Sequence, residues 1–134
     1  MKRKYDEITS IEFSFGGFFS GRSRVSIIGS SDGTATWSVA SRSIDFSEGT
    51  DSKSFETISK EKWEKLRMDL CDKARIISWK SGYVDSNILD GFQWDLEIFF
   101  SDGKTKETGG SNDYPKEWNE FRRLLRKLTG SKEI

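Results

Sequence analysis

Apolar and polar positions alternate along the first third of the chain, which is the pattern of half-buried strands. Residues 11–17, Ile-Glu-Phe-Ser-Phe-Gly-Gly, alternate until the two glycines interrupt the pattern. The pair Asp32 and Gly33 indicates a hairpin turn. The alternation predicts three or four strands before the first helix: residues 11–15, 24–28 and 34–40, with 53–58 as the optional fourth.

The period changes after Ser59, a residue type that favours the N-cap of a helix. Apolar residues then recur at spacings of three and four, as on one face of a helix. They are Trp63, Leu66, Leu70, Ala74 and Ile77. Charged residues fill most other positions, which is typical of a helix that lies on a sheet. The spacing predicts a helix over about residues 60–75.

The next segment predicts a loop followed by a hairpin. Residues 78–91 have no period and indicate a loop, whereas residues 92–100 show the clearest alternation in the chain. A Ser-Asp-Gly-Lys turn at 101–104 leads into a short polar segment, 105–108, which we expect to be an edge strand.

A second helix completes the predicted order of elements. After a connection at 109–113, Pro115 suits the first turn of a helix whose apolar face, 118–128, ends near Gly130. Strands joined by tight turns pair antiparallel. We therefore expect one α+β domain over 1–134, with an antiparallel sheet of five or six strands and both helices packed on one face.

Large aromatic side chains compensate for a low hydrophobic content. Hydrophobic residues make up 34% of the chain and charged residues 33%, a balance close to that of disordered proteins. Ten Phe, five Trp and three Tyr residues nevertheless offer enough area for a core. The periodic positions predict a core that contains Trp37, Trp63, Trp94, Trp118 and Phe121.

Charge and composition exclude several classes of function. The chain has 22 basic and 22 acidic residues and no histidine. A net charge of zero argues against nucleic-acid and membrane-surface binding, because both need a cationic field. Without histidine there is no Ser-His-Asp triad and no imidazole base. We therefore expect a protein that is not an enzyme and that binds no cofactor.

The single cysteine and the lack of long apolar segments predict a cytoplasmic protein. Cys71 permits no disulfide within the chain, and the N-terminal residues lack the apolar run of a secretory signal. No segment is apolar over the roughly 18 residues that a membrane helix needs. Cys71 lies between apolar helix positions, so we expect a packed thiol rather than a nucleophile.

Asp85, Asn87 and Asp90 are candidate oxygen ligands for calcium. An EF-hand loop needs ligands at positions 1, 3, 5 and 12 and glycine at position 6. Counting from Asp85 places Leu89, Asp90 and Leu96 at positions 5, 6 and 12, so the register does not fit. We expect no metal here, and side chains that cap their own loop.

Carboxylate pairs are the remaining candidates for acid and base chemistry. They are Asp90 with Asp95, and Asp95 with Glu97. Asp95 and Glu97 alternate with Trp94 and Leu96, so we expect them on a solvated sheet face. The basic residues of the second helix are Arg122, Arg123, Arg126 and Lys127, and they too suit a solvated face, since cations favour the C-terminal half of a helix. An acidic partner or a phosphate is the alternative for these cations.

Several aromatic residues have no place in the alternating core. They are Phe18, Phe19, Trp79, Tyr83, Phe99 and Tyr114. Large aromatic residues at a surface are enriched in protein interfaces. The alternative is that loops fold back and cover these rings as small satellite clusters.

Local motifs give the chain a family resemblance. It combines the glycine-bearing segment 11–17, two Ser-Asp-Gly turns, and Gly-Ser-Asn-Asp-Tyr-Pro at 110–115 before the last helix. In this order it resembles small uncharacterised bacterial single-domain proteins with a G-x-N-x-Y-P segment, for which no activity is established. In size, neutrality and lack of catalytic residues it is also similar to immunity proteins of bacterial toxin systems.

These observations predict a non-enzymatic, immunity-like protein that recognises another protein, such as a toxin, through exposed aromatic residues, as a monomer or homodimer. The candidate contacts are Phe18, Phe19, Trp79 and Tyr83.

The alternative hypothesis is a module that binds a small ligand or carbohydrate. Its stacking residues would be Trp79, Tyr83 and Tyr114. Its hydrogen-bonding residues would be Asp85, Asn87, Asp90 and Asn112. A third hypothesis, a hydrolase that uses Asp and Glu alone, needs two carboxyl groups about 5 to 10 Å apart in a pocket.

Overall fold

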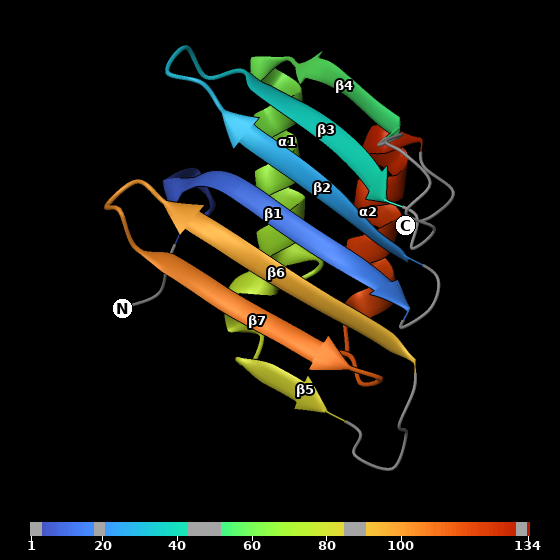
Figure 1. Ribbon diagram of the computed structural model, residues 1–134. Coiled ribbons are helices and arrows are strands. Elements are labelled where there is room, and N and C mark those ends of the chain that lie inside the picture. The colour runs from blue at the N-terminus through green and yellow to red at the C-terminus, as the bar shows by residue number, and fades with distance from the viewer. Residues whose placement is uncertain (1–3, 18–20, 43–51, 85–90, 131–133) are drawn as a thin grey trace.

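A computed structural model describes residues 4–17, 21–42, 52–84, 91–130 and 134 of the chain. They form one sheet, two α-helices and two short 3-10 turns (Figure 1). In chain order the elements are η1 (Tyr5–Glu7), β1 (Ile8–Gly17), β2 (Gly21–Gly29), β3 (Ala35–Arg42), β4 (Ser52–Ile58), α1 (Lys60–Asp72), η2 (Ile76–Ser78), β5 (Gly82–Val84), β6 (Phe92–Phe100), β7 (Thr105–Ser111) and α2 (Trp118–Thr129).

The described strands form a single sheet in the order β4-β3-β2-β1-β6-β7-β5. The predicted α+β class is confirmed, and both helices cover the same face of the sheet (Figure 1). The expectation of five or six antiparallel strands is wrong in detail. The sheet has seven strands, and β5 pairs with β7 in parallel.

The seventh strand, β5, lies inside the predicted loop at 78–91. Its three residues are too few to show an alternating pattern, which is why this strand was not predicted. It pairs with Gly109–Ser111, so β7 runs to Ser111 through residues that we expected to be a connection. The prediction of an edge strand therefore holds only for the N-terminal half of β7, which β5 does not cover.

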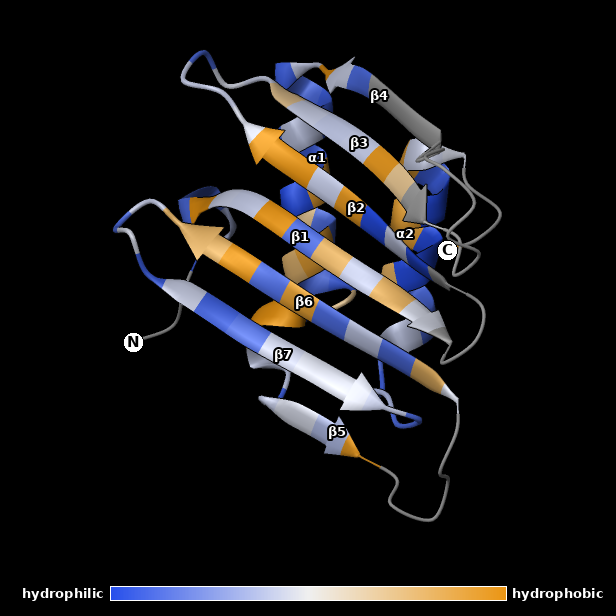
Figure 2. Cartoon of the chain, viewed as in Figure 1, coloured by the Kyte–Doolittle hydropathy of each residue, from blue (hydrophilic) through white to orange (hydrophobic). Residues whose placement is uncertain are grey.

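The central strand, β1, does not stop at its two glycines. Gly16 and Gly17 pair with β2 on one side and with β6 on the other, so the strand continues where an interruption was expected. Along β1, Ile11, Phe13 and Phe15 are buried beneath the helices. The intervening positions face away from the helices, and the alternation of apolar and polar residues is visible along the strands (Figure 2).

Both Asp-Gly hairpins form as predicted. At the first turn, Asp32 accepts hydrogen bonds from the backbone and hydroxyl of Thr34, at 3.0 and 2.6 Å, and these bonds lower the pKa of Asp32. Gly33 and Gly103 occupy the turns with positive φ of 91° and 84°, a conformation that favours glycine.

The helix boundaries follow the predicted caps, with one shorter end. Ser59 caps α1 by accepting from the backbone N–H of Lys62, and Gly130 ends α2 in the left-handed conformation at φ 70°. Helix α1 ends at Asp72 rather than near residue 75, and Arg75 adopts a positive φ of 55° before the chain enters η2. None of the described helices is long and apolar enough to cross a membrane.

The core contains the five aromatic residues that periodicity placed there. Trp37, Trp63, Trp94, Trp118 and Phe121 are all buried. A connected network of aromatic rings lies between α2 and the sheet. In it, Phe13 meets Phe121 edge-on, with their ring centroids 4.9 Å apart. This network continues from the centre of the sheet to the start of α2, where it reaches the surface.

Candidate functional site

A surface hollow of about 530 Å³ lies where the segment after β7 enters α2. We call it the aromatic hollow, and its lining residues are Phe92, Tyr114, Pro115, Lys116, Trp118, Asn119 and Arg122. It brings together the first residue of β6, the connection before α2 and the first turns of α2.

Three aromatic rings in mutual contact, tilted or edge-on to one another, form the wall of the aromatic hollow. The Tyr114 ring lies 4.9 Å from that of Trp118 and 6.0 Å from that of Phe92. Tyr114 is 37% exposed, whereas Trp118 is only 8% exposed and belongs to the core. The predicted exposure of Tyr114 is therefore confirmed, and its ring lies against a rigid, buried support.

Hydrogen bonds fix the segment that carries Tyr114. Asn112 has a positive φ of 58°, and its side-chain oxygen accepts from the backbone N–H of Phe92 at 2.9 Å. The backbone carbonyl of Asp113 accepts from the indole N–H of Trp94 at 2.9 Å. The side-chain oxygen of Asn112, a predicted ligand contact, is thus used to hold the segment in place.

The charge of the aromatic hollow is positive. Lys116 and Arg122 are among its lining residues, and no acidic residue is. Partial burial raises the pKa of the Tyr114 hydroxyl, the charge of Arg122 opposes that rise, and Asp113 adds to it. Tyr114 is consequently a neutral hydrogen-bond donor at physiological pH.

Tyr114 was predicted as a ring outside the core, and Trp118 as part of the core. Phe92 was predicted only as the first residue of an alternating strand, and Arg122 as part of a solvated cluster. A usable signal was present, because Tyr114, Trp118 and Arg122 are spaced by four residues, the distance that aligns side chains on one helix face. The missing information was that Pro115 and the turn before α2 continue this face beyond the helix.

Trp79, predicted to be an exposed contact, is buried, and this prediction is wrong. The residue is 3% exposed, and its ring packs edge-on against Trp94 at 5.7 Å and Phe121 at 5.1 Å. Its indole N–H donates to the carbonyl of Ala74 at 2.9 Å, which satisfies a backbone group just after α1. Trp79 is therefore part of the core and is not available to a partner or a sugar.

Tyr83 is half-buried and serves the fold rather than the aromatic hollow. Its ring lies 5.9 Å from Trp94, and its hydroxyl accepts from the backbone N–H of Lys80 at 2.9 Å. The remaining candidates, Phe18, Phe19, Asp85, Asn87 and Asp90, lie outside the described residues.

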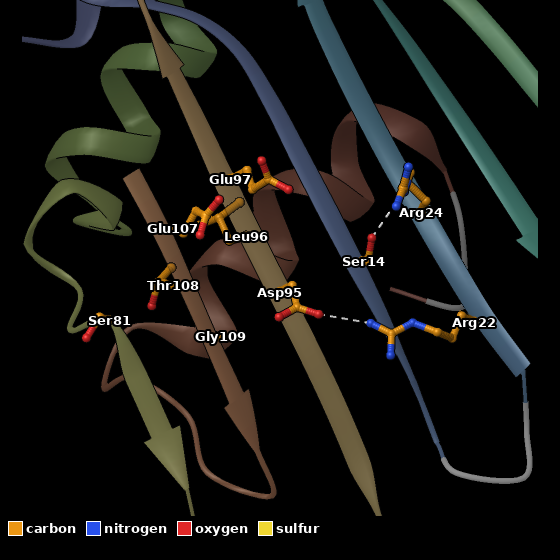
Figure 3. A pocket seen from close by; sticks show the side chains of 10 residues that line it. All are labelled: Ser14, Arg22, Arg24, Ser81, Asp95, Leu96, Glu97, Glu107, Thr108 and Gly109. Carbon is orange, nitrogen blue, oxygen red and sulfur yellow. Dashed lines mark hydrogen bonds and ion pairs between the residues drawn. The ribbon is translucent and has the colours of Figure 1, made fainter. Parts of the chain in front are cut away.

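A second hollow, of about 550 Å³, lies on the face of the sheet opposite the helices, which we call the open face (Figure 3). Its charged lining residues are Arg22, Arg24, Asp95, Glu97 and Glu107. Arg22 forms an ion pair with Asp95 at 3.0 Å, and the Nε of Arg24 donates to Ser14 at 3.2 Å. As predicted, Asp95 and Glu97 lie on the face opposite Trp94 and Leu96.

The carboxylates of the open face are poorly suited to acid and base catalysis. A general acid stays protonated near neutral pH when its site excludes water. The side chain of Asp95 is instead 67% exposed and bound to Arg22. Within the described part of the chain, no group of three or more Cys, Asp and Glu side chains is arranged to hold a metal ion. The face is better suited to recognise a charged surface.

Intramolecular contacts occupy part of the basic cluster on α2. Arg123 donates to Glu120 at 2.6 Å, and this hydrogen bond lowers the pKa of the glutamate. Arg126 donates twice to the backbone oxygen of Ile134, at 2.8 and 3.1 Å. Arg122 is the member of the cluster that lines the aromatic hollow.

The Cys71 thiol is half-buried, as predicted, and we expect it to be unreactive. Burial raises its pKa from 9.0 to about 11, Asp72 adds to the rise, and Arg67 opposes it. The thiolate forms only as the pH rises through that value, so alkylation of the folded protein at pH 8 should be about a hundredfold slower than that of a free cysteine. The rate with iodoacetamide measures this, and equal rates for folded and denatured protein would contradict it.

Comparisons with known proteins yielded no relative of this chain: no family model matches it, and neither does any curated protein or solved structure.

Proposed function

We propose that the chain is a non-enzymatic protein-binding protein that holds a segment of its partner in the aromatic hollow. The observation that carries this proposal is the exposed ring of Tyr114, which packs at a tilt of 37° against the buried ring of Trp118, beside Arg122. Aromatic and arginine side chains that are held in place before binding dominate the energy of protein interfaces. Tyr114 is rigid in this sense, since the anchored segment and the core both support it.

The charge of the aromatic hollow indicates an acidic partner segment. Lys116 and Arg122 lie among the rings without an acidic lining residue, so a carboxylate beside an apolar side chain complements both features of the site. Opposite charges of this kind raise the association rate and exclude basic segments more than they raise affinity. The partner segment should therefore combine one apolar anchor with one or more Asp or Glu residues.

In biological terms we propose an immunity-like role, in which binding inhibits a toxin. The neutral composition and the absence of histidine, together with the exposed anchor, support a role in recognition rather than catalysis. The partner to test first is the protein encoded by the neighbouring gene, because a toxin and its inhibitor must be produced together.

Replacing Tyr114 by alanine should weaken the complex with that partner about 30-fold, the effect of losing an interface anchor worth roughly 2 kcal/mol. The thermal stability of the isolated protein should fall less than the affinity, because Tyr114 lies at the margin of the core and is already 37% exposed. Isothermal titration calorimetry measures the affinity, and a thermal melt measures the stability.

Matched variants separate the aromatic and cationic parts of the site. Tyr114→Phe should retain binding, and Arg122→Glu should weaken it. Lys127→Glu makes the same change of charge on α2 outside the aromatic hollow and should have no effect. If the neighbouring gene product forms no complex, or if Tyr114→Ala lowers stability as much as affinity, the proposal is wrong.

The concave shape of the aromatic hollow favours a second candidate, a carbohydrate or other small ligand that stacks on Tyr114. Of the three stacking residues predicted for this function, Tyr114 alone lines the hollow. Titration with soluble glycans, followed by tryptophan fluorescence, distinguishes the two candidates. A glycan that saturates the wild-type protein but not Tyr114→Ala, with no protein complex formed, would replace our proposal with this one.

A further inference from the structure

The face of the sheet opposite the helices has no cover from the described part of the chain (Figure 1). This is the open face that carries the second hollow. Its central strand is β1, with β2 and β3 on one side and β6 and β7 on the other. This arrangement makes β1 an axis about which the two halves of the face can be compared.

The two halves of the open face carry opposite charges. On the β2 side, Arg22 and Arg24 are the charged residues of their strand, and both are exposed. Arg22 reaches across β1 to form an ion pair with Asp95 of the same chain at 3.0 Å, so part of the opposite charge is neutralised within each copy. On the β6 side, Asp95, Glu97 and Glu107 face outward, and no cation lies on this face of β6 or β7. When a second copy of such a face is turned over by half a turn about the line between its two halves, the basic half of one copy meets the acidic half of the other.

The register places the complementary residues in the same rows across the sheet. Arg24 and Asp95 both pair with Ser14 of β1, one from each side. Ile28, which is 54% exposed, and Phe99 both pair with Ser10. Each pair is therefore symmetric about β1, and one contains opposite charges while the other contains two apolar side chains.

We propose that the open face binds the open face of a second copy of this chain, about a two-fold axis that runs along β1. The rotation exchanges β2 and β6. Arg24 then lies opposite the partner subunit's Asp95, and Ile28 lies opposite the partner subunit's Phe99. Because the axis is two-fold, each of these contacts occurs twice.

The glutamates of the open face are accommodated in the same arrangement. Glu97 shares a row with Ser26, on the opposite side of Glu12, so it lies opposite the neutral side chain of the partner's Ser26 rather than opposite another charge. The two copies of Glu12 approach the axis, and within each copy Glu12 already accepts from Ser26 at 2.8 Å and lies 3.9 Å from Arg24. That local pairing reduces the repulsion at the axis.

The open face is large enough for such an interface. Sheets that pack face to face keep their strands within about 30° of each other, so strand rows remain approximately aligned. Five strands spaced about 4.8 Å apart, each contributing about eight residues, present a plan area of roughly 600 Å². A stable interface buries about 800 Å² of accessible surface per partner, a value that a face with projecting side chains reaches.

The wild-type protein should sediment as a dimer in analytical ultracentrifugation at micromolar concentration, and added salt should weaken the association. In a dimer of the Arg24→Glu variant, each new glutamate faces the partner's Asp95. In a dimer of the Asp95→Arg variant, each new arginine faces the partner's Arg24. Either dimer therefore contains two pairs of like charges. Each variant alone should therefore raise the dissociation constant of the dimer at least about tenfold.

An equimolar mixture of the two variants provides the decisive measurement. In a dimer of one Arg24→Glu chain and one Asp95→Arg chain, both contacts again join opposite charges, so the mixture should dimerise as the wild type does. Lys62→Glu, which changes a charge on α1 behind the sheet, should leave the dimer unchanged. A monomeric wild type, or a mixture that associates no better than its components, overturns the proposal. The aromatic hollow plays no part in it, so the two proposals fail separately.

Discussion

Replacing Trp94 by alanine should lower the free energy of unfolding by about 4 kcal/mol, the middle of the range for truncating a buried aromatic residue. The centroid of the Trp94 ring lies 4.8 Å from that of Trp118 and 5.7 Å from that of Trp79. Removal of the ring therefore leaves a cavity bordered by rigid rings that cannot collapse into it. The carbonyl of Asp113 also loses its indole partner. Denaturation with urea, followed by circular dichroism, measures the change.

Two comparison variants divide this effect into its causes. Trp94→Phe keeps most of the ring area but removes the N–H donor to Asp113, so it should cost less, about 1 to 3 kcal/mol. Gln93→Ala changes the neighbouring residue, whose side chain faces away from the helices, and should alter stability by less than about 0.5 kcal/mol. Equal losses for Gln93→Ala and Trp94→Ala would contradict the register of β6.

Local chemistry made much of this fold predictable. The Asp-Gly turns, the Ser59 cap and the Gly130 end each depend on a few adjacent residues, and all of them form as expected. The alternation in β6 placed Trp94 and Asp95 on opposite faces correctly, because the period of a strand is independent of its partners. These features need no knowledge of the tertiary structure.

Contacts between distant segments were not predictable in the same way. The pairing of β1 with β6 joins residues 75 to 92 positions apart, and no turn signals it. Trp79 follows the last helical residues and lacks a period, yet the carbonyl of Ala74 and the surrounding rings draw it into the core. Its burial depends on partners that the sequence does not place beside it.

The aromatic hollow contains residues that local sequence made predictable and residues that depend on contacts between distant segments. Tyr114 was recognised as a ring outside the alternating core, just before the second predicted helix. Phe92 begins an alternating strand, and at the end of a sheet an inward-facing ring is covered on one side only, so Phe92 is half-buried. The position of a residue along its strand therefore decides whether an apolar side chain closes the core or lines a site.

The adjacent glycines of β7 offer a stringent test of the packing beneath the site. A Cβ at Gly110 would lie 2.4 Å from the Nε1 atom of Trp94 and 2.6 Å from the carbonyl oxygen of Asp113. Neither neighbour is free to move, because the Trp94 indole N–H donates a hydrogen bond to the Asp113 carbonyl and the indole is buried. Gly110→Ala should therefore lower the free energy of unfolding by about 3 kcal/mol, the upper part of the range for overpacking.

Gly109→Ala is the matched control, because it adds the same methyl group one residue earlier on the opposite face. There the closest atom, at 2.8 Å, is a carboxylate oxygen of Asp95, whose exposed side chain can rotate away, although the carbonyl of Trp94 at 3.1 Å must yield slightly. Alanine also favours a strand over glycine by roughly 0.5 to 1 kcal/mol, which offsets that strain. A large loss of stability for Gly110→Ala, beside a small change for Gly109→Ala, would establish that the Trp94 indole and the Asp113 carbonyl meet directly beneath β7. This contact holds the aromatic hollow in place. Equal losses of stability for the two variants would contradict it.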